Sequence, residues 1–199
     1  MKVYIDFDRT LFDCDRFLSD LYDILDKYNI TKEIFRKCQN QCKIMGFNPY
    51  IILDLVKENI NFDNRIYEEV KELIHNTRKY LYDDTISFLE YLKSLNYDII
   101  ILTKGNLDYQ KEKIAMANLE EYYSELIVTM KHKGELKLNY GESIFIDDNP
   151  KEILSILKKN PKRIIRIQRN KSLYSNITID QDVLSFKTLK EIIESKILN

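Results

Sequence analysis

The sequence has no tryptophan, and only four glycines, three prolines and three cysteines among its 199 residues. An odd and small number of cysteines gives no disulfide framework, which fits the reducing conditions of a cytoplasm. With so few glycines and prolines, no low-complexity tract is evident, and neither is an internal repeat. The composition therefore favours an ordinary globular chain.

Long apolar runs and a charge of one sign are also missing. No apolar stretch approaches the length needed to cross a bilayer. The first residues lack the apolar region and cleavage site of a signal peptide, so we expect a cytoplasmic protein without membrane contacts. The formal net charge of -1 provides no basic surface for sequence-independent binding of nucleic acid. A hydrophobic content of 44% is enough for one core, or for a core with an inserted lobe.

Two carboxylates stand two residues apart directly after the apolar run 3–5, in Asp6-Phe7-Asp8-Arg9-Thr10. Like charges this close repel each other and are costly to desolvate. A divalent cation is the usual compensation, and oxygen-only ligands favour magnesium. An acidic turn at a strand end is the simpler interpretation. A second acidic pair, Asp147-Asp148, follows the apolar run 144–146, however, and two such clusters suggest one cation site built from distant segments.

The apolar spacing divides the chain into a helical stretch and an alternating one. Between about 15 and 82 every periodic segment is helical; Thr31 and Asn48 are expected to cap the second and third helices, and the turn 46–49 to face the site. From 83 onward, helices alternate with short apolar runs that are typical of buried parallel strands. This alternation predicts a Rossmann-like α/β fold of three layers. The predicted elements are a strand at 3–7, a helix capped by Asp84, a strand at 99–102, a helix at 106–118, strands at 126–130 and 143–147, a helix from Pro150, a strand at 164–167 and a helix from about 186.

Four polar features fall at predicted carboxyl ends of strands, where open α/β sheets bind ligands. In chain order they are Asp6 and Asp8, Thr103, Lys131 and Lys133, and Asp147 and Asp148. A single threonine or lysine at a strand end is commonly a solvated loop residue. The order and placement of all four is what indicates a site.

With these features the chain resembles the haloacid dehalogenase-like (HAD) hydrolase superfamily. Asp6-Phe7-Asp8-Arg9-Thr10 is similar to its Asp-x-Asp-x-Thr motif, Thr103 closes an apolar strand as in its second motif, and Asp147-Asp148 is similar to its paired acids. The resemblance covers about 1–14 and 83–170. It implies a core of 1–14 and 83–199 with about five strands in the order 5-4-1-2-3. It also implies that 15–82 is a helical cap of the C1 type.

The resemblance further implies a magnesium-dependent phosphatase that acts on a small phosphorylated metabolite. Asp6 would be the nucleophile that forms an aspartyl-phosphate, and Asp8 would act as general acid and then as general base. Thr103 would hydrogen-bond a phosphoryl oxygen, and a lysine would counter the crowded negative charge. The Mg²⁺ would be held by Asp6, by the backbone carbonyl of Asp8 and by Asp148, with Asp147 positioning or sharing in that shell.

Three positions remain open in the sequence. Lys131 and Lys133 are both candidates for the lysine, and we favour Lys133 because Lys-Gly-Glu-Leu resembles the start of the family's next helix. Only 14 residues separate Lys133 from Asp147, so a full helix between them is not expected. Lys104 either adds positive charge for an anionic substrate or points into solvent, and Arg9 either reaches the substrate or forms a surface ion pair.

Two other functions are compatible with the same residues. A phosphotransferase or phosphomutase would pass the phosphoryl group to another hydroxyl, and better exclusion of water would favour it. A non-catalytic phosphate-binding switch would resemble receiver domains, which also combine acidic residues, threonine and lysine. The Asp-x-Asp-x-Thr spacing and the helical insertion argue against that alternative.

Overall fold

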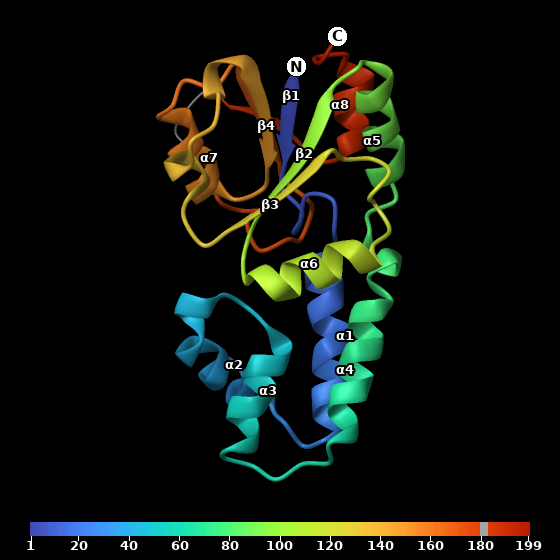
Figure 1. The fold of residues 1–199 in the computed structure, drawn as a ribbon, viewed down its shortest axis with the longest axis vertical. Coiled ribbons are helices and arrows are strands. Elements are labelled where there is room, and N and C mark those ends of the chain that lie inside the picture. Colours follow the sequence, from blue (N-terminus) through green and yellow to red (C-terminus); the bar gives the residue numbers. More distant parts are fainter. Residues whose placement is uncertain (180–182) are drawn as a thin grey trace.

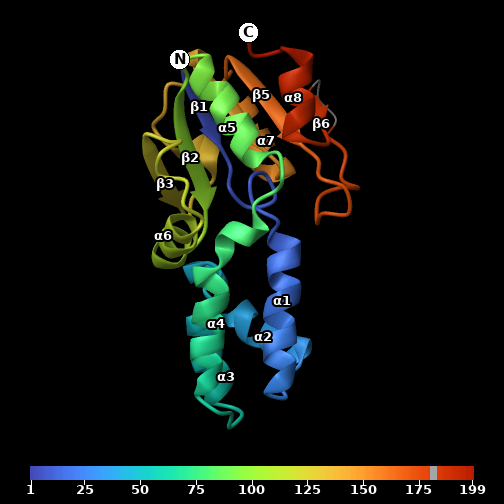
Figure 2. The ribbon, with the colours of Figure 1, turned by 90° about the vertical axis from the view of Figure 1, so that its right-hand side faces the viewer.

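A computed structural model describes residues 1–179 and 183–199, with an α/β half and a helical half (Figures 1 and 2). The α/β half is built on one sheet of six parallel strands in the order β3-β2-β1-β4-β5-β6. The strands are β1 Lys2–Ile5, β2 Asp98–Lys104, β3 Glu125–Thr129, β4 Ser143–Asp147, β5 Arg163–Ile167 and β6 Leu184–Phe186.

The predicted parallel α/β sheet is confirmed, with two corrections. A sixth strand, β6, extends the predicted order at the β5 edge, and it occupies Phe186, where we expected the last helix to begin. Three residues are too short a run to be recognised by apolar spacing. The second correction is that β1 ends at Ile5 instead of residue 7, because the carbonyl of Phe7 accepts the N–H groups of three following residues and turns the chain out of the sheet.

Helices cover both faces of the sheet, and the side chains of β1 show why. Val3 and Ile5 belong to the core formed with α5 (Thr85–Ser94) and α8 (Leu189–Ser195), whereas Tyr4 belongs to the core formed with α7 (Pro150–Leu157). Successive side chains of a strand point to opposite faces, so a strand that is apolar throughout requires a layer on each side. This is the predicted three-layer arrangement.

The helical half consists of α1 Cys14–Lys27, α2 Lys32–Gln41, α3 Pro49–Lys57 and α4 Arg65–His75, with a short 3-10 turn at Lys43–Met45. We call these helices the helical lobe. Both predicted caps are confirmed: Thr31 Oγ1 accepts the N–H of Ile34, and Asn48 Oδ1 accepts that of Tyr50. Among the described residues, none of the helices has the length and apolar content to cross a membrane.

Asp84 directly precedes α5 at the N-cap position, as predicted, but its side chain makes no capping hydrogen bond. Its two carboxylate oxygens accept instead from Arg169, which follows β5, and one of them also accepts the N–H of Leu189 at the start of α8. A guanidinium offers two parallel donors that match a carboxylate, and this pairing outcompetes a local cap. The residue therefore joins three distant segments of the α/β half.

The helical lobe touches the sheet half beside the carboxyl end of β2. The helix that follows this strand, α6 Leu107–Met116, lies between the two halves in Figure 1. Asn106, its cap, donates from its side chain to the carbonyl of Met45 at 3.0 Å and accepts from Asn48 at 3.3 Å. The turn 46–49 of the lobe is thereby held next to the segment that carries Thr103.

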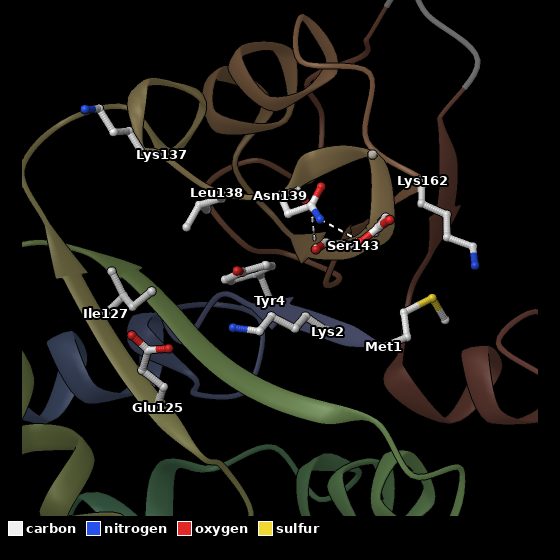
Figure 3. A pocket seen from close by; sticks show the side chains of 12 residues that line it. Met1, Lys2, Tyr4, Glu125, Ile127, Lys137, Leu138, Asn139, Ser143 and Lys162 are labelled. Carbon is white, nitrogen blue, oxygen red and sulfur yellow. Dashed lines mark hydrogen bonds between the residues drawn. The ribbon is translucent and has the colours of Figure 1, made fainter.

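The connection between β3 and β4 contains only two 3-10 turns, η3 Lys133–Glu135 and η4 Tyr140–Glu142, as its length predicts. Without a full helix, part of the sheet face at the amino end of β1 stays open. A cavity of about 820 Å³ lies there, with Tyr4, Ile127 and Leu138 around it (Figure 3). Since ligands of parallel sheets bind at the opposite, carboxyl ends of the strands, the position of this cavity does not mark the active site.

Candidate active site

The ends of β1 and β4 bring three carboxylates together. These strands are parallel neighbours with Ile5 opposite Ile146, so the residues that follow them meet at one edge of the sheet. Asp6, Asp147 and Asp148 each offer a carboxylate oxygen, and these oxygens lie within 4.8 Å of one another. Their exposed fractions are only 7%, 2% and 4%, so water screens their repulsion poorly.

One lysine bridges this cluster. The Lys133 ammonium lies 2.6 Å from Asp6 Oδ1 and 2.6 Å from Asp147 Oδ2, and the side chain is 2% exposed. Its backbone is fixed on both sides, because its N–H donates to Glu152 and its carbonyl accepts the Tyr140 hydroxyl. The other candidate, Lys131, is exposed.

A single ammonium leaves the cluster short of positive charge. Burial raises the pKa of Asp6 to about 7, against the opposing charge of Lys133 and with the support of Asp147 and Asp8. Burial and the neighbouring carboxylates likewise hold the pKa of Asp148 well above its usual range. The buried Asp148 Oδ2 has no hydrogen-bond partner among the described residues. Lysine and one divalent cation together would balance three carboxylates, and oxygen donors suit Mg²⁺, so the residues present fit that ion.

Thr103 ends the buried part of β2, the other neighbour of β1. Its hydroxyl is buried and, within the described part of the chain, has no hydrogen-bond partner. It lines a chamber of about 170 Å³ together with the three carboxylates and Lys133. That volume corresponds to roughly six water-sized groups, enough for a phosphoryl group with a cation and a water. We call this space the strand-end chamber.

Asp8 is held by two residues that the sequence did not reveal. Lys113 Nζ lies 2.6 Å from Asp8 Oδ1, and Gln110 Nε2 donates to Oδ2 at 2.8 Å; both come from α6. Burial opposes ionisation of this carboxyl, but the ion pair and the bonds from Lys113 and Gln110 outweigh it and hold the pKa of Asp8 below its usual range. In this arrangement Asp8 is a carboxylate.

Lys104 and Arg9 line the chamber but are already paired. Lys104 donates to Glu152 Oε1 at 3.0 Å, and Arg9 forms an ion pair with Asp15 at 2.8 Å. Glu152 was not predicted; it lies in the first turn of α7, where the helix dipole and nearby backbone donors favour an acid. In the sequence, its position five residues after Asp147 is the feature that could have identified it as a site residue.

A loop after β5 forms another wall of the site, also unforeseen. Arg166 donates to the carbonyls of Tyr174 and Ile177 and so fixes this loop against the sheet. Tyr174 lines the strand-end chamber, and the Arg9 guanidinium lies 5.9 Å from the centre of its ring. No motif in the sequence distinguishes this tyrosine from the other thirteen.

A second chamber of about 270 Å³ adjoins the first, and Asp8, Arg9 and Lys104 line both. It lies between the helical lobe and the sheet half, with side chains from α1, the turn 46–49 and α6 around it. The site therefore has two connected compartments: a polar one at the strand ends and a second one beneath the lobe.

Comparisons with known proteins agree with this geometry. The sequence profile of the family described as haloacid dehalogenase-like hydrolase matches residues 3–165. A search of curated protein sequences gave no match.

Solved structures share the fold at low identity. One is a provisionally named haloacid dehalogenase-like hydrolase from Burkholderia xenovorans LB400, with a TM-score of 0.76 and 17% identity over 99% of this chain and 97% of that one. Another is a provisionally named beta-phosphoglucomutase from Thermotoga maritima (TM-score 0.65, 16% identity, 99% and 100% covered). A third is the L-2-haloacid dehalogenase from Xanthobacter autotrophicus (TM-score 0.64, 13% identity, 97% and 98% covered). Because the profile spans most of the sequence and the fold agrees throughout, this chain belongs to the haloacid dehalogenase-like hydrolase family.

Proposed function

We propose that this protein is a magnesium-dependent phosphatase that hydrolyses a small phosphate monoester through a covalent aspartyl-phosphate. The observation that carries the proposal is the buried cluster of three carboxylates with one lysine. It lies beside a chamber lined by Thr103, whose hydroxyl has no hydrogen-bond partner in the described part of the chain. Displacement of a halide by a carboxylate needs no proton donor, because halide leaves as an anion. Neither Asp8 nor a cation-binding cluster would then be required.

Asp6 would attack phosphorus. The bond from its carboxylate oxygen to phosphorus forms as the bond to the leaving oxygen breaks, and Asp8 gives that oxygen a proton. Water then attacks the phosphorus of the aspartyl-phosphate and passes a proton to Asp8, which frees phosphate and restores Asp6. Thr103 would donate a hydrogen bond to a phosphoryl oxygen, and Lys133 would stabilise its growing charge.

The hydrogen bonds also suggest different roles for the adjacent residues Asp147 and Asp148. Asp147 already uses both oxygens, one with Lys133 and one with the N–H of Asn149. One oxygen of Asp148 has no hydrogen-bond partner among the described residues, so we assign Asp148, with Asp6 and the carbonyl of Asp8, to the direct ligands of Mg²⁺. When bound, the ion would neutralise phosphoryl charge and align the attack.

Asp8 must change partners during this cycle. Paired with Lys113 it is ionised and suited to accept a proton from water, which is the second half of the reaction. To protonate the leaving oxygen it has to arrive protonated, so the ion pair must open when substrate enters. Lys113 and Gln110 are therefore positioning residues that act through Asp8.

We further propose that residues 15–82 are a C1-type cap on a core of 1–14 and 83–199. The support is the link from Asn106 to Met45 and Asn48, which places the lobe over the second chamber. In a closed site of this kind the leaving group would be held beneath the lobe and bulk water excluded.

The test is hydrolysis of a generic aryl phosphate with Mg²⁺. Asp6→Asn should abolish turnover while the far-ultraviolet circular dichroism spectrum stays unchanged, and EDTA should stop the unmodified protein. Asp26→Asn, the same chemical change on the exposed face of α1, is the matched control and should retain turnover. Turnover by Asp6→Asn equal to that of the control would eliminate the mechanism, and full activity in EDTA would eliminate the cation. Analysis of products in the presence of sugar acceptors separates release of inorganic phosphate from phosphoryl transfer to a hydroxyl.

A further inference from the structure

Most of the surface of the second chamber is apolar, although polar and charged side chains, among them Gln39 of α2, also line it, and this surface bears on the leaving group. Its apolar lining comes from both halves of the molecule: Cys14, Phe17, Leu18, Phe47, Tyr109 and Leu173. Leu173 belongs to the loop after β5 and is 61% exposed, which leaves an apolar surface at the chamber's edge. Burial of apolar surface is favourable, whereas a hydroxyl buried here without a partner is penalised. The lining therefore favours an apolar leaving group over a sugar or polyol.

The charges around this chamber are already balanced. Among the described residues that line it, each cationic side chain is paired with a carboxylate: Arg9 with Asp15 at 2.8 Å, Lys104 with Glu152 at 3.0 Å and Lys113 with Asp8 at 2.6 Å. A second phosphate or a carboxylate on the substrate would lose its hydration, and the only ammonium it could find released from these pairs is that of Lys113, while Asp8 is protonated. A leaving group with its own negative charge is thus disfavoured.

One buried polar group in the lining lacks a partner. Gln110 uses its amide nitrogen for Asp8, but its buried carbonyl oxygen Oε1 accepts no hydrogen bond within the described part of the chain. A substrate hydroxyl or amine on the leaving group would satisfy that oxygen. An unsatisfied buried acceptor is costly, so this hydrogen bond would also favour a substrate with such a donor over its apolar analogue.

The volume limits the size of the leaving group. About 270 Å³ corresponds to roughly nine water-sized groups. Sites for drug-sized ligands begin at about 300 Å³. A single six-membered ring with a short substituent fits within this space, whereas a nucleoside, with a base and a ribose, would extend past the exposed edge at Leu173.

We propose that the substrate is the phosphate monoester of a compact, uncharged, one-ring aromatic alcohol that carries a single hydrogen-bond donor. This inference rests on the proposed function and adds the chemistry of the leaving group. The phosphoryl group occupies the chamber at the strand ends, and the ring packs among the apolar side chains of the second chamber beneath the lobe.

The experiment compares kcat/KM for three phosphate esters with Mg²⁺: benzyl phosphate, glucose 6-phosphate and 3-phosphoglycerate. They present an uncharged aromatic, an uncharged polyol and an anionic leaving group. We expect benzyl phosphate to exceed each of the others by at least tenfold. A higher kcat/KM for glucose 6-phosphate or 3-phosphoglycerate would overturn the inference and leave the phosphatase assignment standing.

A variant that places a charge in the chamber gives a second readout. Leu18→Lys introduces an unpaired ammonium and should raise the ratio of kcat/KM for 3-phosphoglycerate over benzyl phosphate at least tenfold, mainly through KM. Leu18→Met, of similar volume and uncharged, is the matched control and should keep the preference for benzyl phosphate. An unchanged ratio in Leu18→Lys would show that the leaving group does not enter this chamber. If no phosphate ester, p-nitrophenyl phosphate included, is hydrolysed, the proposed function itself fails and the inference falls with it.

Discussion

Removal of the Lys133 ammonium is the sharpest test of the site's electrostatics. Lys133→Met keeps an unbranched apolar stem but deletes the charge that lies 2.6 Å from both Asp6 and Asp147. Breaking a buried ion pair by removing one partner costs about 3–5 kcal/mol, because the other charge stays buried without compensation. For a chain of this length the loss corresponds to a fall in melting temperature of roughly 6–20 °C.

The loss of stability in Lys133→Met should increase as the pH rises. Asp6 already has a pKa of about 7 against an ordinary value of 3.8, and without Lys133 the carboxyl pKa values of the cluster rise further. The folded variant then retains protons that the unfolded chain has released, so its stability falls as pH rises from the ordinary carboxyl pKa through the raised ones. The destabilisation should be largest near pH 8 and much smaller near pH 5.5, where protonation neutralises the acids.

Denaturant unfolding at both pH values, in EDTA, measures this difference. Lys131→Met removes the same group from an exposed lysine two residues away and should change the free energy of unfolding by less than about 0.5 kcal/mol. A loss in Lys133→Met that is equal at the two pH values would refute the reasoning, since packing and not charge would then explain it. An equal loss in Lys131→Met would refute it as well.

Two further predictions concern the surroundings of the same cluster. A Cβ at Gly134 would lie 2.1 Å from the backbone oxygen of Ser155, so Gly134→Ala should lower the free energy of unfolding by about 1–3 kcal/mol; Gly141→Ala, with 4.0 Å of clearance, should have little effect in the same denaturation assay. Mg²⁺ should raise the melting temperature more at pH 7.5 than at pH 5.5, because it competes with protons for the carboxyl groups whose pKa is raised. In a thermal unfolding experiment, Asp148→Asn should show a much smaller increase in melting temperature with Mg²⁺. A shift that is independent of pH and survives in Asp148→Asn would place the ion elsewhere.

Much of the fold was predictable because its signals are local. Short apolar runs predicted five of the six strands. Because parallel strands have their carboxyl ends at the same edge of a sheet, the sequence alone predicted that Asp6 and Asp147 lie close together. Strand β6 was not predicted because a run of three residues is too short to show a hydrophobic periodicity. Asp84 stands at the predicted N-cap position, but its side chain does not cap the helix, because a distant guanidinium competes for the same carboxylate and only the fold brings Arg169 near it.

Sequence patterns did not predict the residues that bind the side chain of Asp8. Lys113 and Gln110 stand on a polar helical segment, and a lysine in such a segment normally points into solvent. Here α6 lies between the two halves of the molecule, with Thr77 donating to the carbonyl of Lys113, so this side chain is buried against Asp8. Its environment comes from helices that are distant in the chain.

The sequence by itself determined the parallel α/β framework, the helical insertion and the acidic motifs at strand ends, because hydrophobic periodicity and spacing are properties of neighbouring residues. Tertiary structure alone decided that Lys133 and not Lys131 bridges the carboxylates, that the cations beneath the lobe are already paired, and that a chamber with a largely apolar surface adjoins the strand-end chamber. Such pairings depend on distances between segments far apart in the chain, and those distances exist only once the two halves have packed together.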